Sequence, residues 1–311
     1  MKYLLIVLVV GVVSFGVIFL LTTDFLMEFT TEDPAEEDSD VVEEDDETES
    51  DEEEEEEKEE DEEKAKLYSE EIIGKSVEGR DIVSHRYGGG DDRIIFVGGI
   101  HGGYSWGTSL LSYEIIDHLE DNFEIIPENV EVIVIPVLNP DGLSKVVEVD
   151  GRFDPSDVIG DTVVGRFNAN SVDINRNFDC NWESEGVWQN KVIDAGSEPF
   201  SEPESEAIKD FIKNSKPEAV VVYFGAAGSV YTSTCYGDVL NQTEELMDVY
   251  ADASGYSAEG IFDSYKITGD MADWLSKIDI PAISVLLDSH DSSEWDKNRR
   301  GLEAVLEMYG N

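Results

Sequence analysis

The sequence contains few basic residues: 21 Lys and Arg stand against 72 Asp and Glu among its 311 residues, for a formal net charge of −51. A nucleic-acid-binding surface needs clustered Lys and Arg to neutralise phosphates. We therefore expect no nucleic-acid partner. A net charge of this size keeps a protein soluble and is compatible with a high-salt habitat.

Cysteine and histidine are also scarce, at two and four residues. Two cysteines exclude a disulfide-rich scaffold, and they leave two interpretations for Cys180 and Cys235. Outside the cell such a pair usually forms one disulfide, whereas the alternative is a buried pair of free thiols. A zinc site normally needs three or four protein ligands. Any imidazole ligand has to come from His85, His101, His118 and His290.

A long uncharged run of mostly apolar residues lies near the amino terminus. Residues 3–23, 21 in number, carry no charge. As a helix they would cover roughly the ~30 Å of a bilayer core. We predict a transmembrane signal anchor over residues 1–23, with a cleaved secretory signal as the alternative. Because Lys2 precedes the run and acidic residues follow it, the carboxyl-terminal part should lie outside the cytoplasm of a single-pass membrane protein.

An acidic tract follows, in which 24 of residues 32–63 are Asp or Glu. Such a segment repels itself and cannot bury apolar surface. We predict a disordered acidic linker over residues 24–64, acting as a solvated stalk, although a cation-binding role is a possible alternative. The composition becomes that of a globular domain over residues 65–311.

The globular part alternates between apolar strands and amphipathic helices. This alternation predicts an α/β fold with a mixed, mostly parallel central sheet and helices on both faces. Ser201, followed by Glu204, has the spacing of a capping box at a helix start. After a strand pair within 65–92, the expected strands are 93–100, 129–137, 218–224 and 282–287, and the expected helices are 107–120, one from 201, 241–254, 270–277 and 293–309.

Two groups of residues point to a ligand site. His101, in "GGIHGG", follows the first buried strand, and ligands of such sheets bind where parallel strands end. Arg166 and Arg176 lie among asparagines in "VGRFNANSVDINRNFDC". Guanidinium groups bind carboxylates in a bidentate manner. The alternative is that the two arginines only balance neighbouring acids.

Several short motifs occur in one order and together resemble the zinc carboxypeptidases of the carboxypeptidase A type. The resemblance covers roughly residues 67–310 and implies a carboxypeptidase-like fold. The motifs are "SVEGRDI", "GGIHGG", "NPDG", "GRFNANSVDINRNFDC", "PFSEPE", "YKITGDMADWL" and "IPAISV".

The resemblance implies a zinc ion held by two His and one Glu, with a further Glu as general base. His101 matches the first ligand. The Glu is replaced by Tyr104 or Ser105, depending on the spacing used, and Ser105 could instead cap the next helix. Phe224 occupies the second His position and Leu286 the general-base position. We therefore expect no bound zinc.

The resemblance leaves the residues for substrate binding in place. Arg166 matches the arginine that stabilises the oxyanion, Asn175 and Arg176 match the pair that holds the terminal carboxylate, and Tyr265 matches the tyrosine that closes over it. Asp273 and Trp274 match the structural end of the same loop. Ala272 lies near the position that sets side-chain preference, and its small size favours apolar or aromatic groups.

No other residues in the sequence rebuild the metal site. Asp288 lies two strand positions beyond Leu286, about 6–7 Å away, and His290 is interpreted as a structural loop residue. The favoured hypothesis is a pseudo-peptidase that still binds peptides with a free carboxyl terminus. Two alternatives remain: an active metallocarboxypeptidase with an unconventional metal site, and a structural or adhesive ectodomain.

Overall fold

The computed structural model describes residues 67–149 and 151–310. The predicted anchor (1–23) and the predicted linker (24–64) lie outside these residues. Within the described residues no helix is both long enough and apolar enough to cross a membrane. The strands are β1 (Tyr68–Lys75), β2 (Asp81–Tyr87), β3 (Asp92–Val97), β4 (Val130–Ile135), β5 (Glu185–Trp188), β6 (Lys191–Asp194), β7 (Ala219–Gly225), β8 (Ser229–Thr232), β9 (Ser257–Ile261) and β10 (Ala282–Leu287); the α-helices are α2 (Gly107–Asp121), α3 (Pro140–Ser144), α4 (Pro203–Ser215), α5 (Asn241–Ser254), α6 (Met271–Lys277) and α7 (Trp295–Tyr309).

Eight strands form one mixed sheet in the order β1-β2-β4-β3-β7-β10-β8-β9. The four central strands β4, β3, β7 and β10 run parallel to one another. The pairs β1–β2, β2–β4 and β10–β8 are antiparallel. Because the central strands are parallel, their carboxyl ends meet at one edge of the sheet, where α/β folds bind ligands. The predicted fold class is confirmed for this part of the chain.

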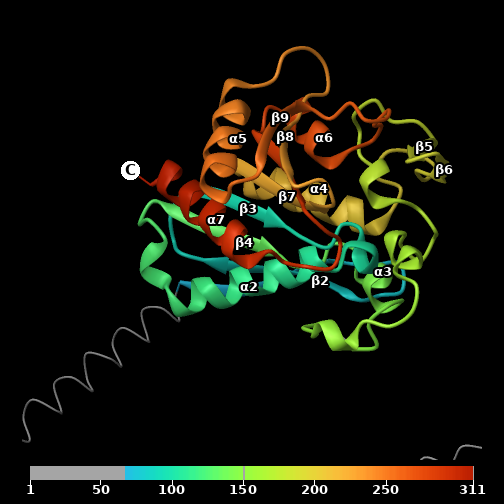
Figure 1. Ribbon diagram of the computed structural model, residues 1–311, viewed down its shortest axis with the longest axis horizontal. Coiled ribbons are helices and arrows are strands. Elements are labelled where there is room, and N and C mark those ends of the chain that lie inside the picture. The colour runs from blue at the N-terminus through green and yellow to red at the C-terminus, as the bar shows by residue number, and fades with distance from the viewer. Residues whose placement is uncertain (1–66, 150, 311) are drawn as a thin grey trace, which may run out of the picture. The chain divides into compact units, whose positions relative to one another are not determined.

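Helices cover both faces of the sheet, and alternation along the strands decides which residues meet them. Ile94 of β3 packs with α2, α5 and α7, and α7 lies between the other two (Figure 1). Ile95, the next residue, faces the opposite side and packs with α4 and α6. Since successive strand side chains point to opposite faces, a continuous apolar run is what a sheet covered on both faces requires.

Several details differ from the sequence-based predictions. Helix α4 begins at Pro203, and its cap residue, Glu202, makes no side-chain capping bond, so the capping box predicted at Ser201 was wrong. The side chain of Ser201 instead accepts a hydrogen bond from Asn177 Nδ2 at 3.0 Å. Four short strands were also missed: β5 and β6, which form a hairpin, and β8 and β9.

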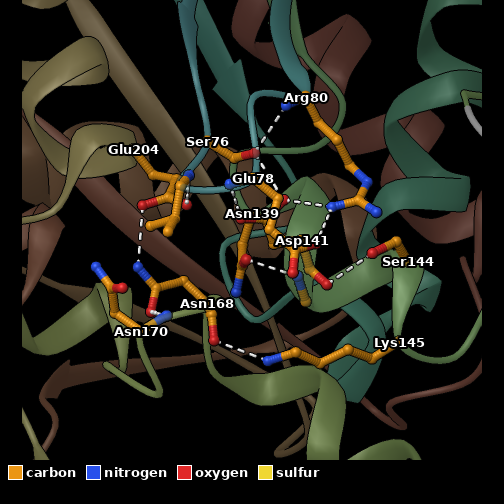
Figure 2. A network of polar contacts seen from close by, with 12 residues as sticks. Ser76, Glu78, Arg80, Asn139, Asp141, Ser144, Lys145, Asn168, Asn170 and Glu204 are labelled. Carbon is orange, nitrogen blue, oxygen red and sulfur yellow. Dashed lines mark hydrogen bonds and ion pairs between the residues drawn. The ribbon is translucent and has the colours of Figure 1, made fainter.

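A buried carboxylate at the start of α3 joins this helix to the turn between β1 and β2. Asp141 is fully buried and accepts hydrogen bonds from Ser76 Oγ at 2.6 Å, Glu78 N at 3.0 Å and Arg80 Nη1 at 2.7 Å. A charge can be buried in this way only when it is paired and hydrogen-bonded. Figure 2 shows these donors converging on Asp141 from the turn between β1 and β2.

The same polar network extends to the segment that carries Arg166. Asn139 Nδ2 donates to the carbonyl of Arg166 at 3.4 Å, and Lys145 Nζ donates to the carbonyl of Asn168 at 2.7 Å. Asn168 Nδ2 in turn donates to Glu204 Oε2 at 3.1 Å, which links the segment to α4 (Figure 2). The motifs around these residues therefore position the backbone of the candidate site.

Cys180 and Cys235 form a disulfide, which confirms the first of the two interpretations and not the buried pair of free thiols. It joins the end of the arginine-containing segment to the chain that follows β8, across a sequence separation of 55 residues. Gly269 N donates to the carbonyl of Cys180 at 2.8 Å, so the bridge also lies against the loop before α6.

Replacing both cysteines by alanine is expected to lower the free energy of unfolding by about 2–4 kcal/mol, because the cross-link restricts the unfolded chain. Urea denaturation of the oxidised protein and of the double variant would measure the difference. Treating the double variant with a reducing agent is the control and should change nothing. Equal midpoints for the two oxidised proteins would contradict the prediction.

Candidate functional site

A cavity of about 340 Å³ opens at the carboxyl ends of the parallel strands. Its lining includes His101, which follows β3, Phe224 of β7 and Leu286 of β10. Phe224 and Leu286 are paired in register on neighbouring strands, so their side chains lie side by side as an apolar floor. The structure thus brings together these three positions, which the sequence assigned to metal ligation and proton transfer.

His101 is buried beside the floor, with its ring centroid 5.6 Å from that of Phe224. Its Nε2 lies 3.4 Å from Asp173 Oδ1, and neither ring nitrogen makes a hydrogen bond within the described residues. Burial, reinforced by the Arg166 charge, lowers the pKa of His101 to about 4. The imidazole is therefore neutral near pH 7, and it is a buried polar group without a hydrogen-bonding partner.

Asp173 is a site residue that the sequence analysis missed. It is fully buried, accepts a hydrogen bond from Arg166 Nε at 2.9 Å and forms an ion pair with Arg166 Nη2 at 2.7 Å. Burial alone would raise the pKa of Asp173, but its interactions with Arg166, His101 and Arg176 together outweigh burial and hold the pKa well below its usual range. The sequence offered one indication of this role: Asp173 lies in the motif "GRFNANSVDINRNFDC", two residues before Asn175.

Tyr104 and Ser105 lie in different places, and the sequence had left open which of them occupies the position of the glutamate ligand. Tyr104 lines the cavity and lies between Trp188 and His290, at centroid distances of 5.1 Å and 4.3 Å. Ser105 Oγ lies 3.0 Å from His290 Nδ1 and makes no side-chain cap, so the capping role suggested for it was wrong. Gly102, with φ of +42°, lets this segment pass close to the backbone of Leu143.

Of the two residues considered as replacements for the lost metal ligands, His290 lines the cavity and Asp288 does not. His290 was interpreted as a structural loop residue, yet it lines the cavity. A Cβ on Gly225 would come within 2.5 Å of His290 Nδ1, so glycine is needed where β7 ends. Asp288 points away from the cavity and pairs with Lys297 at 2.6 Å. It therefore does not substitute for the missing carboxylate.

Arg166, Asn175, Arg176 and Tyr265 all line the cavity. Arg176 is buried and donates to the carbonyls of Asn175 at 2.7 Å and Val187 at 3.3 Å, while its Nε has no hydrogen-bonding partner among the described residues. Asn175 is engaged at both ends, donating to Asp270 at 2.6 Å and accepting from Met271 N at 3.1 Å. Arg176 is thus the residue of this group with buried donor capacity left for a ligand.

Trp188 forms part of the same wall, which the sequence did not predict. It belongs to the missed strand β5, and the Arg166 guanidinium stacks over its ring at 4.5 Å. Near the mouth, Tyr265 packs edge-on against Phe262 at 5.0 Å. Stacking and ion pairing together fix the orientation of Arg166 in the cavity wall.

Two carboxyl groups form another part of the wall. Asp270 caps α6 by accepting from Ala272 N at 2.8 Å and Asp273 N at 3.1 Å, and Asp273 accepts from Thr234 N at 3.1 Å. Asp273 was matched to a structural position but lines the cavity, whereas Ala272 is buried outside it. Burial, followed by the charge of Asp270, raises the pKa of Asp273 to about 8.

This raised pKa should make stability fall as pH increases. Between about pH 4 and pH 8 the folded protein holds a proton on Asp273 that the unfolded chain releases. The free energy of unfolding therefore decreases as the pH rises through this range. Asp273→Asn removes the titrating group, so the variant avoids this loss of stability. The asparagine side chain has nearly the same shape and keeps an oxygen that can accept from Thr234 N. Its gain in melting temperature should be larger at pH 8 than at pH 5, by at least about 2–4 °C.

Differential scanning fluorimetry at the two pH values would measure this gain. Asp252→Asn, which removes an exposed carboxylate on α5, is the control and should show no such difference. An equal gain for Asp273→Asn at both pH values would contradict the argument.

Comparison with known proteins identifies the family to which this chain belongs. Residues 57–292 match the family model described as zinc carboxypeptidase. The chain belongs to the zinc carboxypeptidase family. The resemblance inferred from the motifs is therefore confirmed, and it extends over most of the described residues.

Individual relatives of this zinc carboxypeptidase family member include a carboxypeptidase B of Astacus astacus, 32% identical over 154 residues, or 47% of this chain and 50% of the relative. A zinc carboxypeptidase of Simulium vittatum is 26% identical over 238 residues, covering 68% of this chain and 75% of the relative. The match thus spans about half the length of the crayfish protein.

A solved structure, bovine thrombin-activatable fibrinolysis inhibitor in complex with tick carboxypeptidase inhibitor, shares the fold. The TM-score is 0.63 at 17% identity, with 79% of this chain and 90% of that chain covered. At this identity the likeness supports the fold alone.

The residues of the cavity do not fit the family's zinc ion. A zinc site needs at least three nitrogen, sulfur or oxygen donors within bonding distance. Here His101 is accompanied by a phenyl group at Phe224 and by the Ser105 hydroxyl, which lies against His290. Within the described residues no group of three or more His, Cys, Asp or Glu is arranged to hold a metal ion.

Proposed function

We propose that this protein is a pseudo-peptidase of the zinc carboxypeptidase family that binds peptides by their free carboxyl terminus and does not hydrolyse them with zinc. One observation carries the proposal: Arg176 is buried in the cavity wall, and its Nε has no hydrogen-bonding partner in the part of the chain that the structure describes. A buried donor without a partner is costly, and a peptide carboxylate would supply the missing acceptor.

The rest of the cavity supports binding without hydrolysis. Its volume of about 340 Å³ falls within the range of small-ligand pockets. A vestigial pocket filled by its own side chains, as expected of a purely structural ectodomain, would not leave this space. Phe224 and Leu286 replace polar groups that would be costly to bury unpaired once the metal was lost.

We further propose that the domain is anchored to a membrane and lies outside the cytoplasm. The uncharged run at residues 3–23 and the acidic tract after it support this placement. The disulfide between Cys180 and Cys235 also supports it, because disulfides persist in oxidising compartments.

Isothermal titration calorimetry with short peptides tests the binding proposal. A free-acid peptide should bind, and the same peptide with a carboxyl-terminal amide should bind at least about tenfold more weakly, because it lacks the charge that Arg176 recognises. Equal binding of both forms, or binding of neither, would rule out carboxylate recognition.

Metal analysis tests the other half of the proposal. After dialysis against zinc and removal of the excess, the protein should retain far less than one zinc ion per chain. Stoichiometric zinc together with chelator-sensitive release of a terminal residue would establish an active metallocarboxypeptidase instead.

A further inference from the structure

A three-residue motif at the start of α5 has no part in the cavity. The sequence contains a single Asn-x-Ser/Thr triplet in which x is not proline, and it consists of Asn241, Gln242 and Thr243. Such a triplet is the acceptor for N-linked oligosaccharides in exported proteins. Triplets of this kind also arise by chance. The case for a modification site therefore depends on whether the asparagine is accessible and whether the fold itself uses the threonine.

The asparagine of the triplet lies open to solvent. Asn241 is the first residue of α5 and is exposed, and so are Gly237 and Asp238 in the segment that leads to it. Tyr236, at the start of that segment, is 69% exposed. A bulky hydrophilic group on the Asn241 amide would therefore extend into water and would not displace packed side chains.

The threonine of the triplet has a hydroxyl that the fold does not use. Thr243 is fully buried, and its Oγ1 has no hydrogen-bonding partner within the described residues. It is not a helix cap, because α5 begins after Leu240 without a side-chain capping bond, and Thr243 donates to the Leu240 carbonyl through its backbone amide at 2.9 Å. A buried hydroxyl without a partner costs folding free energy, which a valine of similar shape would avoid. A step that needs this hydroxyl before α5 packs would account for its presence.

The nearby disulfide supports export of this segment. Cys235 lies six residues before Asn241 and is bonded to Cys180. Disulfides persist in oxidising compartments, and exported chains also receive their N-linked oligosaccharides outside the cytoplasm.

We propose that Asn241 is a site of N-linked glycosylation. In this reaction the Nδ2 atom of Asn241 forms a bond to the anomeric carbon of an oligosaccharide that is carried on a lipid phosphate. The bond between that carbon and the phosphate oxygen breaks, the lipid phosphate leaves with the bonding electrons, and the amide gives up one proton to a base of the transferase. Nothing is oxidised or reduced. The inference rests on the proposed placement of the domain outside the cytoplasm and is independent of peptide binding.

Mass spectrometry of the full-length protein, purified from the membranes of the cells that produce it naturally, tests the site. The proteolytic peptide that contains Asn241 should be heavier than its sequence mass by at least one sugar residue, and fragmentation should place the added mass on Asn241. Asn190 is the internal control, because it is exposed but has Val192 in place of the hydroxyl residue, so its peptide should have the sequence mass. An unmodified Asn241, or added mass on Thr243 instead, would overturn the proposal.

Variants of the triplet separate modification from folding. Thr243→Val and Asn241→Gln should both lose the added mass completely, whereas Thr243→Ser keeps the hydroxyl and should keep the added mass. The melting temperature of Thr243→Val should equal or exceed that of Asn241→Gln, because both lack the oligosaccharide and only Thr243→Val lacks the unpaired hydroxyl. Added mass that survives in Thr243→Val, or a clearly lower melting temperature of that variant, would contradict the assignment.

A membrane-impermeant, amine-reactive label applied to intact cells distinguishes failure of the site from failure of the proposed placement. It should react with Lys213 and Lys216, which are exposed at the end of α4. If these lysines are labelled and Asn241 carries no sugar, the glycosylation site alone is wrong. If the lysines react only after the cells are opened and Asn241 carries no sugar, the placement outside the cytoplasm is wrong as well.

Discussion

Replacing Arg176 by alanine is expected to weaken binding of free-acid peptides by about tenfold to a hundredfold, because a hydrogen bond to a charged group contributes about 1.5–3 kcal/mol. The guanidinium is buried, lines the cavity and has a free Nε, so its loss removes the principal donor for the carboxylate. Calorimetric titration would measure the change, and peptides ending in an amide should be nearly unaffected.

A matched control is available in Arg152, which does not line the cavity. Its guanidinium pairs with Asp117 at a distance of 2.7 Å. Arg152→Ala should bind as the unaltered protein does. Because Arg176 also donates to the carbonyls of Asn175 and Val187, its alanine variant has to be checked for folding. Arg176→Lys keeps the charge without the planar fork and should show an intermediate loss. Unchanged binding in both Arg176 variants would refute the assignment.

Restoring the missing ligands is expected to raise the affinity for zinc well above that of the unaltered protein. The double variant Ser105→Glu with Phe224→His would add a carboxylate and an imidazole near His101, whose ring lies 5.6 Å from that of Phe224. Since Tyr104 rather than Ser105 faces the cavity, Tyr104→Glu with Phe224→His is the parallel variant. At least one of them should bind zinc more tightly than about 1 µM.

Competition with a chromogenic chelator would measure the affinity. Adding His101→Gln to the better variant is the control, because it removes one of three ligands and should abolish binding. If the unaltered protein already bound zinc as tightly, the ion would have to use ligands other than these. Adding Leu286→Glu places a carboxyl group next to position 224 in register, where the family's general base is expected.

The sequence predicted the positions of the central strands well, because uninterrupted apolar runs such as residues 219–224 fit a sheet that is buried on both faces. It missed the hairpin β5–β6, since four-residue strands of mixed polarity leave no clear periodicity. That hairpin carries Trp188, so the aromatic partner of Arg166 could not be identified from the sequence.

Within the site, motif matching located His101, Phe224 and Leu286 but could not tell which groups were already engaged. Asn175 matched a carboxylate-binding residue, yet its amide is bonded to Asp270 and to the start of α6. Asp273 matched a structural position, yet it faces the cavity. Such differences depend on how loops that are distant in sequence approach one another, which local patterns do not encode.

The buried Asp141 has a consequence for how the domain opens. Its carboxylate joins the β1–β2 turn to α3, and α3 is linked through Asn139 to the backbone of Arg166. Detaching the first hairpin would strand a desolvated charge, so partial unfolding at that edge should also disturb the backbone of Arg166 in the cavity wall. We therefore expect the protease susceptibility of the β1–β2 edge to depend on whether the cavity is occupied.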